Sequence, residues 1–176
     1  MWMDRFWTWS LEIEDMRSLI VGLGNPIMGD DAIGCRCAEA IETALSPQEL
    51  DMVEVIQFFR GGISLMERLI GYDRVLIIDS ITGSGLNLGA VKKLTLDEIP
   101  SYTVNSPHDG SLKNALAFGK LMGADLPRKV DILAVEIEPK FEFSDQLSEP
   151  VEAGIPQVLQ LALDWIFQEE KVTDYS

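Results

Sequence analysis

The sequence has few cations, and this scarcity limits its partners. Lys and Arg together number 14 against 29 Asp and Glu, which gives a formal net charge of −15. Binding to the phosphate backbone of nucleic acids or to an anionic membrane surface needs clustered cations, so the balance disfavours both partners. The simplest explanation of this acidity is solubility. The more specific alternative is that the acidic surface binds a partner with a basic surface.

Cysteine is also scarce, since Cys35 and Cys37 are the only two. They lie two residues apart in a predicted helix, where their side chains point in different directions. The pair is therefore a poor candidate for a disulfide or a shared metal site, and a buried, inert role is expected. Without a cysteine framework the expected compartment is the reducing cytoplasm. The sequence has no run of the roughly 18 apolar residues that a membrane-spanning helix needs.

The length of 176 residues is that of one domain. We expect a single α/β domain over residues 17–168, an N-terminal extension over 1–16 and a polar tail over 169–176. The extension contains three of the four tryptophans. It is either an ordered segment that packs its aromatic side chains or a leader upstream of a start at Met16.

Strand-like and helix-like segments alternate along the chain. This alternation predicts a three-layer α/β/α fold, with a mostly parallel twisted sheet of about five strands and helices on both faces. The predicted strands are 18–22, 52–58, 74–78, 90–94 and 130–137, the fourth at a sheet edge because it carries Lys92 and Lys93. The predicted helices are 31–45, 63–70, 109–122 and a last one that follows an N-cap at Ser148, in which Pro156 predicts a kink or a late start.

Three candidate functional groups follow predicted strands. Asp30-Asp31 opens the first helix, Asp79 closes the most apolar strand, and His108, the only histidine, precedes the helix at 109–122. Open α/β sheets place their chemistry at the carboxyl ends of strands, which is where these groups fall. The structural alternatives are helix capping for the Asp pair, a turn or cap for Asp79 and an ordinary loop residue for His108.

The convergence of these groups indicates a metal site. Two carboxylates brought together repel each other, and the pKa of one rises unless a cation lies between them. One imidazole and two carboxylates form a mixed nitrogen and oxygen ligand set with open positions for water or substrate, which suits Zn, Ni, Fe or Mn. The glycine-containing loop before Asp30 is a poor nucleotide site, because Ile27 replaces the third glycine of the dinucleotide motif and the aspartates would repel phosphate.

Several segments together resemble the [NiFe]-hydrogenase maturation endopeptidases, which remove a C-terminal extension from the hydrogenase large subunit after nickel insertion. The matching segments are Leu19-Ile20-Val21-Gly22-Leu23-Gly24-Asn25, Gly29-Asp30-Asp31-Ala32-Ile33-Gly34, Val75-Leu76-Ile77-Ile78-Asp79, Ser106-Pro107-His108-Asp109, Ile137-Glu138-Pro139 and Leu147-Ser148-Glu149-Pro150-Val151. The chain departs from the family pattern at Asp31, where relatives often have Glu, at Ser80, where a small apolar residue is common, and in the turn Phe58-Phe59-Arg60-Gly61-Gly62.

The resemblance implies that Asp31, Asp79 and His108 are the metal ligands and the catalytic residues. It also implies that the partner is a [NiFe]-hydrogenase large-subunit precursor and that this substrate supplies the nickel, although Zn or another divalent ion could occupy the site. A metal-polarised carbonyl or a metal-bound water would drive peptide hydrolysis, and a carboxylate acting as general base is the other option. The resemblance leaves the oligomeric state open.

Two other functions are alternatives. One is a chaperone that senses nickel in the same precursor without cutting it, because sensing and catalysis would use the same ligands. The other is a peptidyl-tRNA hydrolase, whose opening resembles Leu19 to Pro26. That family needs a histidine-asparagine pair shortly downstream, where this chain has Gly29-Asp30-Asp31, and the net charge of −15 is unsuited to tRNA.

Overall fold

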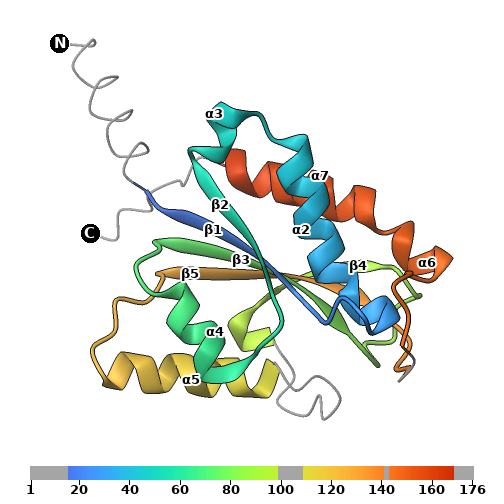
Figure 1. Ribbon diagram of the computed structural model, residues 1–176. Helices are drawn as coiled ribbons and strands as arrows, with labels where there is room; N and C mark the ends of the chain where they lie inside the picture. The colour runs from blue at the N-terminus through green and yellow to red at the C-terminus, as the bar shows by residue number, and fades with distance from the viewer. Residues whose placement is uncertain (1–15, 99–108, 141–142, 169–176) are drawn as a thin grey trace.

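The computed structural model describes residues 16–98, 109–140 and 143–168. They form three layers, with a five-stranded sheet between two layers of helices (Figure 1). The strand order is β2-β1-β3-β5-β4. The strands are β1 (Ser18–Leu23), β2 (Val53–Phe58), β3 (Arg74–Ile81), β4 (Val91–Thr95) and β5 (Lys129–Glu136). All neighbouring pairs are parallel except β4 and β5. The predicted α/β architecture is confirmed.

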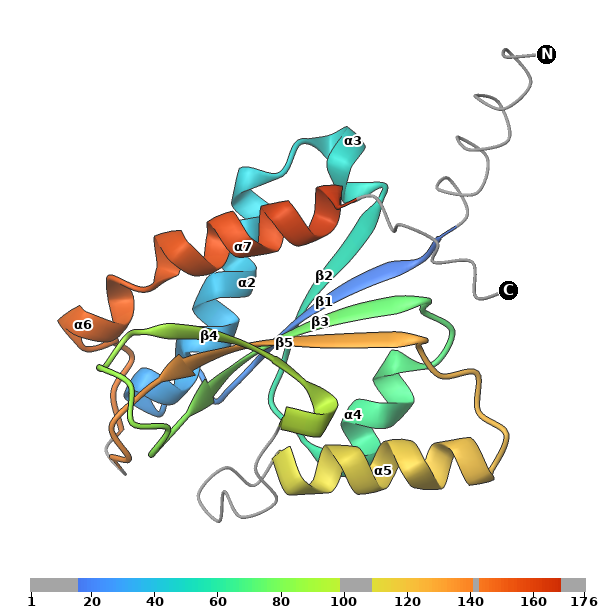
Figure 2. The same ribbon diagram turned by 180° about the vertical axis from the view of Figure 1, so that it is seen from behind.

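Helices cover both faces of the sheet (Figures 1 and 2). One face carries α2 (Ile33–Ala44) and α7 (Ile155–Phe167), and the other carries α4 (Gly62–Leu69) and α5 (Asp109–Leu121). The shorter elements are the 3₁₀ helices η1 (Gly29–Ala32) and η2 (Leu96–Glu98) and the helices α3 (Pro47–Leu50) and α6 (Glu149–Glu152). Within the described residues, no helix is long and apolar enough to cross a membrane.

The central strand β3 is buried along its whole length. Ile78 packs into the apolar cluster under α2 and α7, whereas Val75 and Ile77 pack into the cluster under α4 and α5. A strand covered on both faces needs apolar side chains at successive positions rather than at alternate ones. This explains the continuous apolar run, and β3 continues past the predicted end at Ile78 because it pairs with β5 as far as Ile81.

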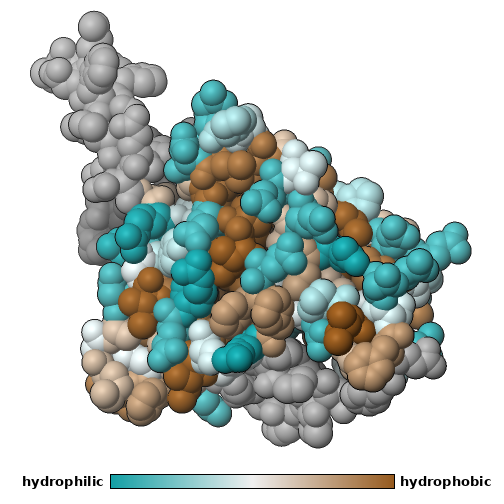
Figure 3. All heavy atoms as spheres, in the orientation of Figure 1, coloured by the Kyte–Doolittle hydropathy of each residue, from teal (hydrophilic) through white to brown (hydrophobic). Residues whose placement is uncertain are grey.

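The outer strands differ in character. At one edge, β4 exposes Lys92 and Lys93, which confirms the predicted edge position. At the other edge, Figure 3 shows hydrophobic residues exposed over the region of β2, with Met52 exposed before the strand and Phe59 after it. The late helix start at Pro156 is also confirmed, since α6 ends at Glu152 and α7 begins one residue before that proline.

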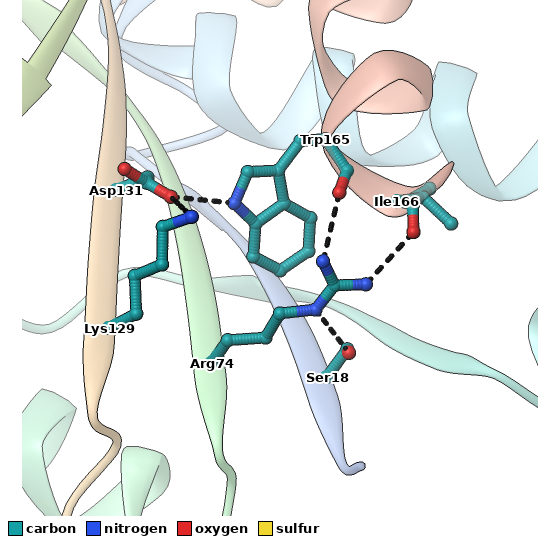
Figure 4. A network of polar contacts seen from close by, with 6 residues as sticks. All are labelled: Ser18, Arg74, Lys129, Asp131, Trp165 and Ile166. Atoms are coloured by element: carbon teal, nitrogen blue, oxygen red, sulfur yellow. Dashed lines mark hydrogen bonds and ion pairs between the residues drawn. The ribbon is translucent and has the colours of Figure 1, made fainter. Parts of the chain in front are cut away.

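A buried arginine at the start of β3 secures the end of α7 (Figure 4). The Arg74 guanidinium donates to Ser18 Oγ at 2.8 Å and to the carbonyls of Trp165 and Ile166 at 3.0 and 2.9 Å. It also lies 4.4 Å from the centroid of the Trp165 ring, whose Nε1 donates to Asp131 Oδ2 at 2.8 Å. Because the last carbonyls of a helix lack partners within it, Arg74 satisfies groups that burial would otherwise leave unpaired.

Candidate active site

Two glycines bring α2 into direct contact with the strands. A Cβ at Gly34 would lie 2.0 Å from the carbonyl oxygen of Leu23 and 2.4 Å from that of Ile78, and a Cβ at Gly22 would lie 2.2 Å from Gly34 O. Gly24 has a φ of +147°, and a Cβ there would lie 2.0 Å from Asp31 O. The glycines of this loop therefore serve close backbone packing, which holds η1 over the ends of β1 and β3.

Replacing Gly34 with alanine tests this close contact. An alanine normally stabilises a helix by up to about 1 kcal/mol relative to glycine. Here we expect the opposite sign, a loss of about 2–3 kcal/mol in the free energy of unfolding, because the new methyl group overlaps two backbone carbonyls. Urea denaturation followed by circular dichroism measures the change. Glu42→Ala, at an exposed position of the same helix, is the control and should stay within about 0.5 kcal/mol of the parent. A Gly34→Ala protein of unchanged stability would contradict the contact.

Both carboxylate oxygens of Asp31 accept hydrogen bonds, and neither caps a helix. The backbone N–H of Asn25 donates to Oδ2 at 2.9 Å, and the hydroxyl of Ser80 donates to Oδ1 at 3.2 Å. No side-chain cap forms at the start of η1 or at Ala32, the residue before α2. The capping interpretation of this aspartate is therefore wrong, and the predicted helix at 31–45 begins instead as the 3₁₀ turn η1.

Asp79 lies near the end of β3 and is 3% exposed. Its Oδ1 accepts the backbone N–H of Ser80 at 2.8 Å. Strands β1 and β3 are neighbours, yet α2, the first α-helix after β1, lies on one face of the sheet, and α5, which follows β3 by way of β4 and η2, lies on the other. Open α/β sheets bind their ligands at such a switch point, outside the carboxyl ends of the strands. The structure thus brings Asp31 and Asp79 to one place, with Ser80 touching both.

The thiols near these carboxylates are unreactive. Cys35 Sγ lies 3.6 Å from Gly22 O and 3.4 Å from Gly24 O. Burial raises the pKa of Cys35 to about 11, and the charges of Asp31 and Asp79 add to the rise. Burial likewise raises the pKa of Cys37 to about 12. Both cysteines are free, buried and protonated at neutral pH, as expected from the sequence, so neither is a nucleophile.

Asp30 has a different partner from Asp31. Its Oδ1 accepts the backbone N–H of Ser148 at 2.6 Å, and its Oδ2 accepts the hydroxyl of Ser148 at 2.8 Å. Ser148 does stand directly before α6, as predicted, but its side chain binds Asp30 and does not cap the helix. Two backbone hydrogen bonds beside it join Gly29 to Ser144 and Ser144 to Ile27. The loop that carries Asp31 is therefore fastened to the segment before α6.

Glu136 is a residue whose role the sequence did not reveal. It ends β5 and is 5% exposed. Its carboxylate accepts the backbone N–H groups of Gly83 and Ser84 at 2.8 and 3.2 Å, and also the Ser84 hydroxyl. It therefore anchors the loop that follows β3. The only signal in the sequence was an acidic residue interrupting an apolar strand, a pattern that does not identify its partners.

The third predicted ligand, His108, lies outside the described residues. The same holds for residues 1–15 and 169–176, so the predicted extension and tail stay predictions. Among the residues that the structure does describe, no group of three or more His, Cys, Asp and Glu side chains is arranged to hold a metal ion. The part of the predicted ligand set that the structure brings together is Asp31 and Asp79.

Comparison with known proteins agrees with this fold. The HycI hydrogenase maturation protease model matches residues 35–165. The hydrogenase 2 maturation protease of Escherichia coli is 29% identical over 150 residues, which cover 82% of this chain and 89% of that protein. HoxM, a hydrogenase expression/formation protein of Azotobacter vinelandii, is 30% identical over 152 residues, 84% of this chain and 71% of that protein. The solved structure of the hydrogenase maturating endopeptidase HybD from E. coli superimposes with a TM-score of 0.73 and 29% identity, over 86% of this chain and 92% of that one. The chain belongs to the hydrogenase maturation protease family.

Proposed function

We propose that this protein is an endopeptidase that removes a C-terminal extension from the nickel-loaded large-subunit precursor of a [NiFe] hydrogenase. Family membership and the likeness to the endopeptidase HybD support a peptidase acting in hydrogenase maturation. The observation that carries the nickel-dependent part is the meeting of two carboxylates, Asp31 and Asp79, at the ends of neighbouring central strands. We expect the reaction to take place in the cytoplasm.

In this proposal the nickel belongs to the substrate, and Asp31, Asp79 and His108 bind it. Asp31 and Asp79 each accept a hydrogen bond from Ser80, and a divalent cation bound by both carboxylates would cancel their mutual repulsion. Imidazole added to these oxygens makes a donor set that suits nickel and also zinc or another divalent ion. The position of α5 supports His108 as the third ligand, since this helix begins directly after it and both ribbon views set that beginning toward the carboxyl end of the sheet (Figures 1 and 2).

A cation at this position would polarise the scissile carbonyl or activate a water for its hydrolysis. In this chain, Asp31 and Asp79 would hold the cation in place. The protonated thiol of Cys35 beside them favours attack by water over a covalent thioester route. A carboxylate acting as general base is the remaining option for the same two residues.

Incubation with nickel-loaded and nickel-free precursor tests the proposal. We expect cleavage of the loaded form alone, detected as loss of the C-terminal peptide by mass spectrometry. Equal cleavage of both forms, or of neither, would contradict the proposal. The His108→Ala variant separates the enzyme from a non-cleaving nickel sensor: loss of cleavage with retained precursor binding supports the enzyme.

A further inference from the structure

Ser80 contacts both carboxylates of the site. Its backbone N–H donates to Asp79 Oδ1 at 2.8 Å, and its hydroxyl donates to Asp31 Oδ1 at 3.2 Å. The residue is 6% exposed, so water competes little for either hydrogen bond. Hydrogen bonds to ionised acceptors are about twice as strong as neutral ones, and low polarity around them strengthens them further. Ser80 is thus placed to fix how the two carboxylates stand relative to each other.

The alternation of side chains along β3 explains how one residue reaches both. Ile78, two positions before Ser80, packs into the cluster under α2 and α7. Ile77, two positions before Asp79, packs into the cluster under α4 and α5. Successive strand residues face opposite sides of a sheet, so the Ser80 hydroxyl is directed to the side of η1 and α2, where Asp31 lies. The Ser80 backbone meanwhile holds Asp79 on the other side of the strand.

Asp31 depends on Ser80 for its orientation. The Asn25 N–H holds Oδ2, and the Ser80 hydroxyl holds Oδ1, so both ends of the carboxylate are fixed. The terminal torsion of an aspartate is broad, and a single hydrogen bond leaves the group free to rotate about it. Hydrogen-bond partners of metal-binding groups orient those groups, and their loss typically weakens metal affinity or activity by 10- to 100-fold.

We propose that Ser80 is a positioning residue that sets the carboxylate of Asp31 for binding the nickel of the precursor. The discrimination between loaded and unloaded precursor therefore depends on a hydroxyl at position 80. This inference rests on the proposed function, because it concerns the same site and the same substrate. It adds a residue that does not itself bind the metal and acts through Asp31.

Ser80→Ala and Ser80→Thr test the assignment, with Ser18→Ala as the matched control. Ser18 is also a buried strand serine, but its hydroxyl accepts a hydrogen bond from Arg74 at the opposite end of the strands, where β1 and β3 begin. The readouts are the Kd for nickel-loaded and nickel-free precursor, measured by stopped-flow fluorescence before cleavage, and kcat. We expect Ser80→Ala to lower kcat and the preference for loaded precursor by about tenfold each, with binding of the unloaded form unchanged. Ser80→Thr keeps the hydroxyl and suits a strand, so it should retain most of the parent's kcat and most of its preference for loaded precursor. Ser18→Ala should show the same preference for loaded precursor as the parent.

The same variants in an Asp31→Ala background separate positioning from a general structural effect. If Ser80 acts through Asp31, adding Ser80→Ala to Asp31→Ala should not change the ratio of the Kd for nickel-free precursor to the Kd for nickel-loaded precursor. A persistent tenfold effect in that background, an equal loss in Ser18→Ala, or an unchanged preference in Ser80→Ala overturns the assignment of Ser80. A parent protein that cleaves both precursors equally, or cleaves neither, overturns the proposed function, and the assignment with it.

Discussion

Replacement of Asp79 with asparagine is expected to lower kcat for cleavage of nickel-loaded precursor by about 10³-fold, which corresponds to about 4 kcal/mol of transition-state stabilisation. Asparagine has the shape of aspartate and keeps an oxygen that can accept the Ser80 N–H, so the local geometry survives. It loses the negative charge that binds the cation in the proposed function. Single-turnover cleavage followed by mass spectrometry measures the effect.

The stability of Asp79→Asn distinguishes this explanation from unfolding. The side chain is 3% exposed, and an amide is less costly to bury than a carboxylate. We therefore expect a free energy of unfolding equal to that of the parent or higher. Asp51→Asn, which changes the same charge at an exposed position after α3, should leave kcat unchanged. Full cleavage by Asp79→Asn would contradict its role as a ligand.

Replacement of Arg74 with methionine is expected to lower the free energy of unfolding by about 3–5 kcal/mol. Methionine fills much of the same space but donates nothing to Ser18 Oγ or to the carbonyls of Trp165 and Ile166. Those two carbonyls lie in the last turn of α7, so the substitution weakens the attachment of that helix to the sheet. Urea denaturation followed by circular dichroism measures it, and the thermal midpoint should fall by about 10 °C.

Arg68→Met is the matched control for this loss. Arg68 pairs with Glu54 at the surface, where both side chains are more than a third exposed, and such pairs contribute about 0–1 kcal/mol. Its removal should therefore change the free energy of unfolding by no more than about 1 kcal/mol. Equal losses in the two variants would show that Arg74 contributes no more than a surface ion pair.

The fold was predictable where one local pattern decides the structure. The apolar run of β3 predicts a buried strand, and the lysines of β4 predict an edge strand, because burial and exposure select each residue directly. The antiparallel placement of β4 beside β5 has no such local cause. It depends on pairing between segments far apart in the chain, such as Lys93 with Leu133.

In the candidate site, the positions of the two carboxylates were predictable and their hydrogen-bond partners were not. Asp31 and Asp79 follow predicted strands, and the architecture of open α/β sheets brings such positions together. The partner of Asp30 is 118 residues away at Ser148, and that of Glu136 is 53 residues away at Gly83. No local pattern indicates a hydrogen bond over that separation. For this reason the sequence suggested helix capping for Asp30, where the structure has a long-range contact.

The contact between Asp30 and Ser148 also joins a segment made early in synthesis to one made late. The ribosome releases Asp30 and Asp31 early, but the residue that fastens their loop comes 118 positions later. Until Ser148 has emerged and reached Asp30, the nascent chain carries the carboxylates without the anchored loop that presents them. The anchored form of the loop therefore requires nearly the whole domain to have been synthesised.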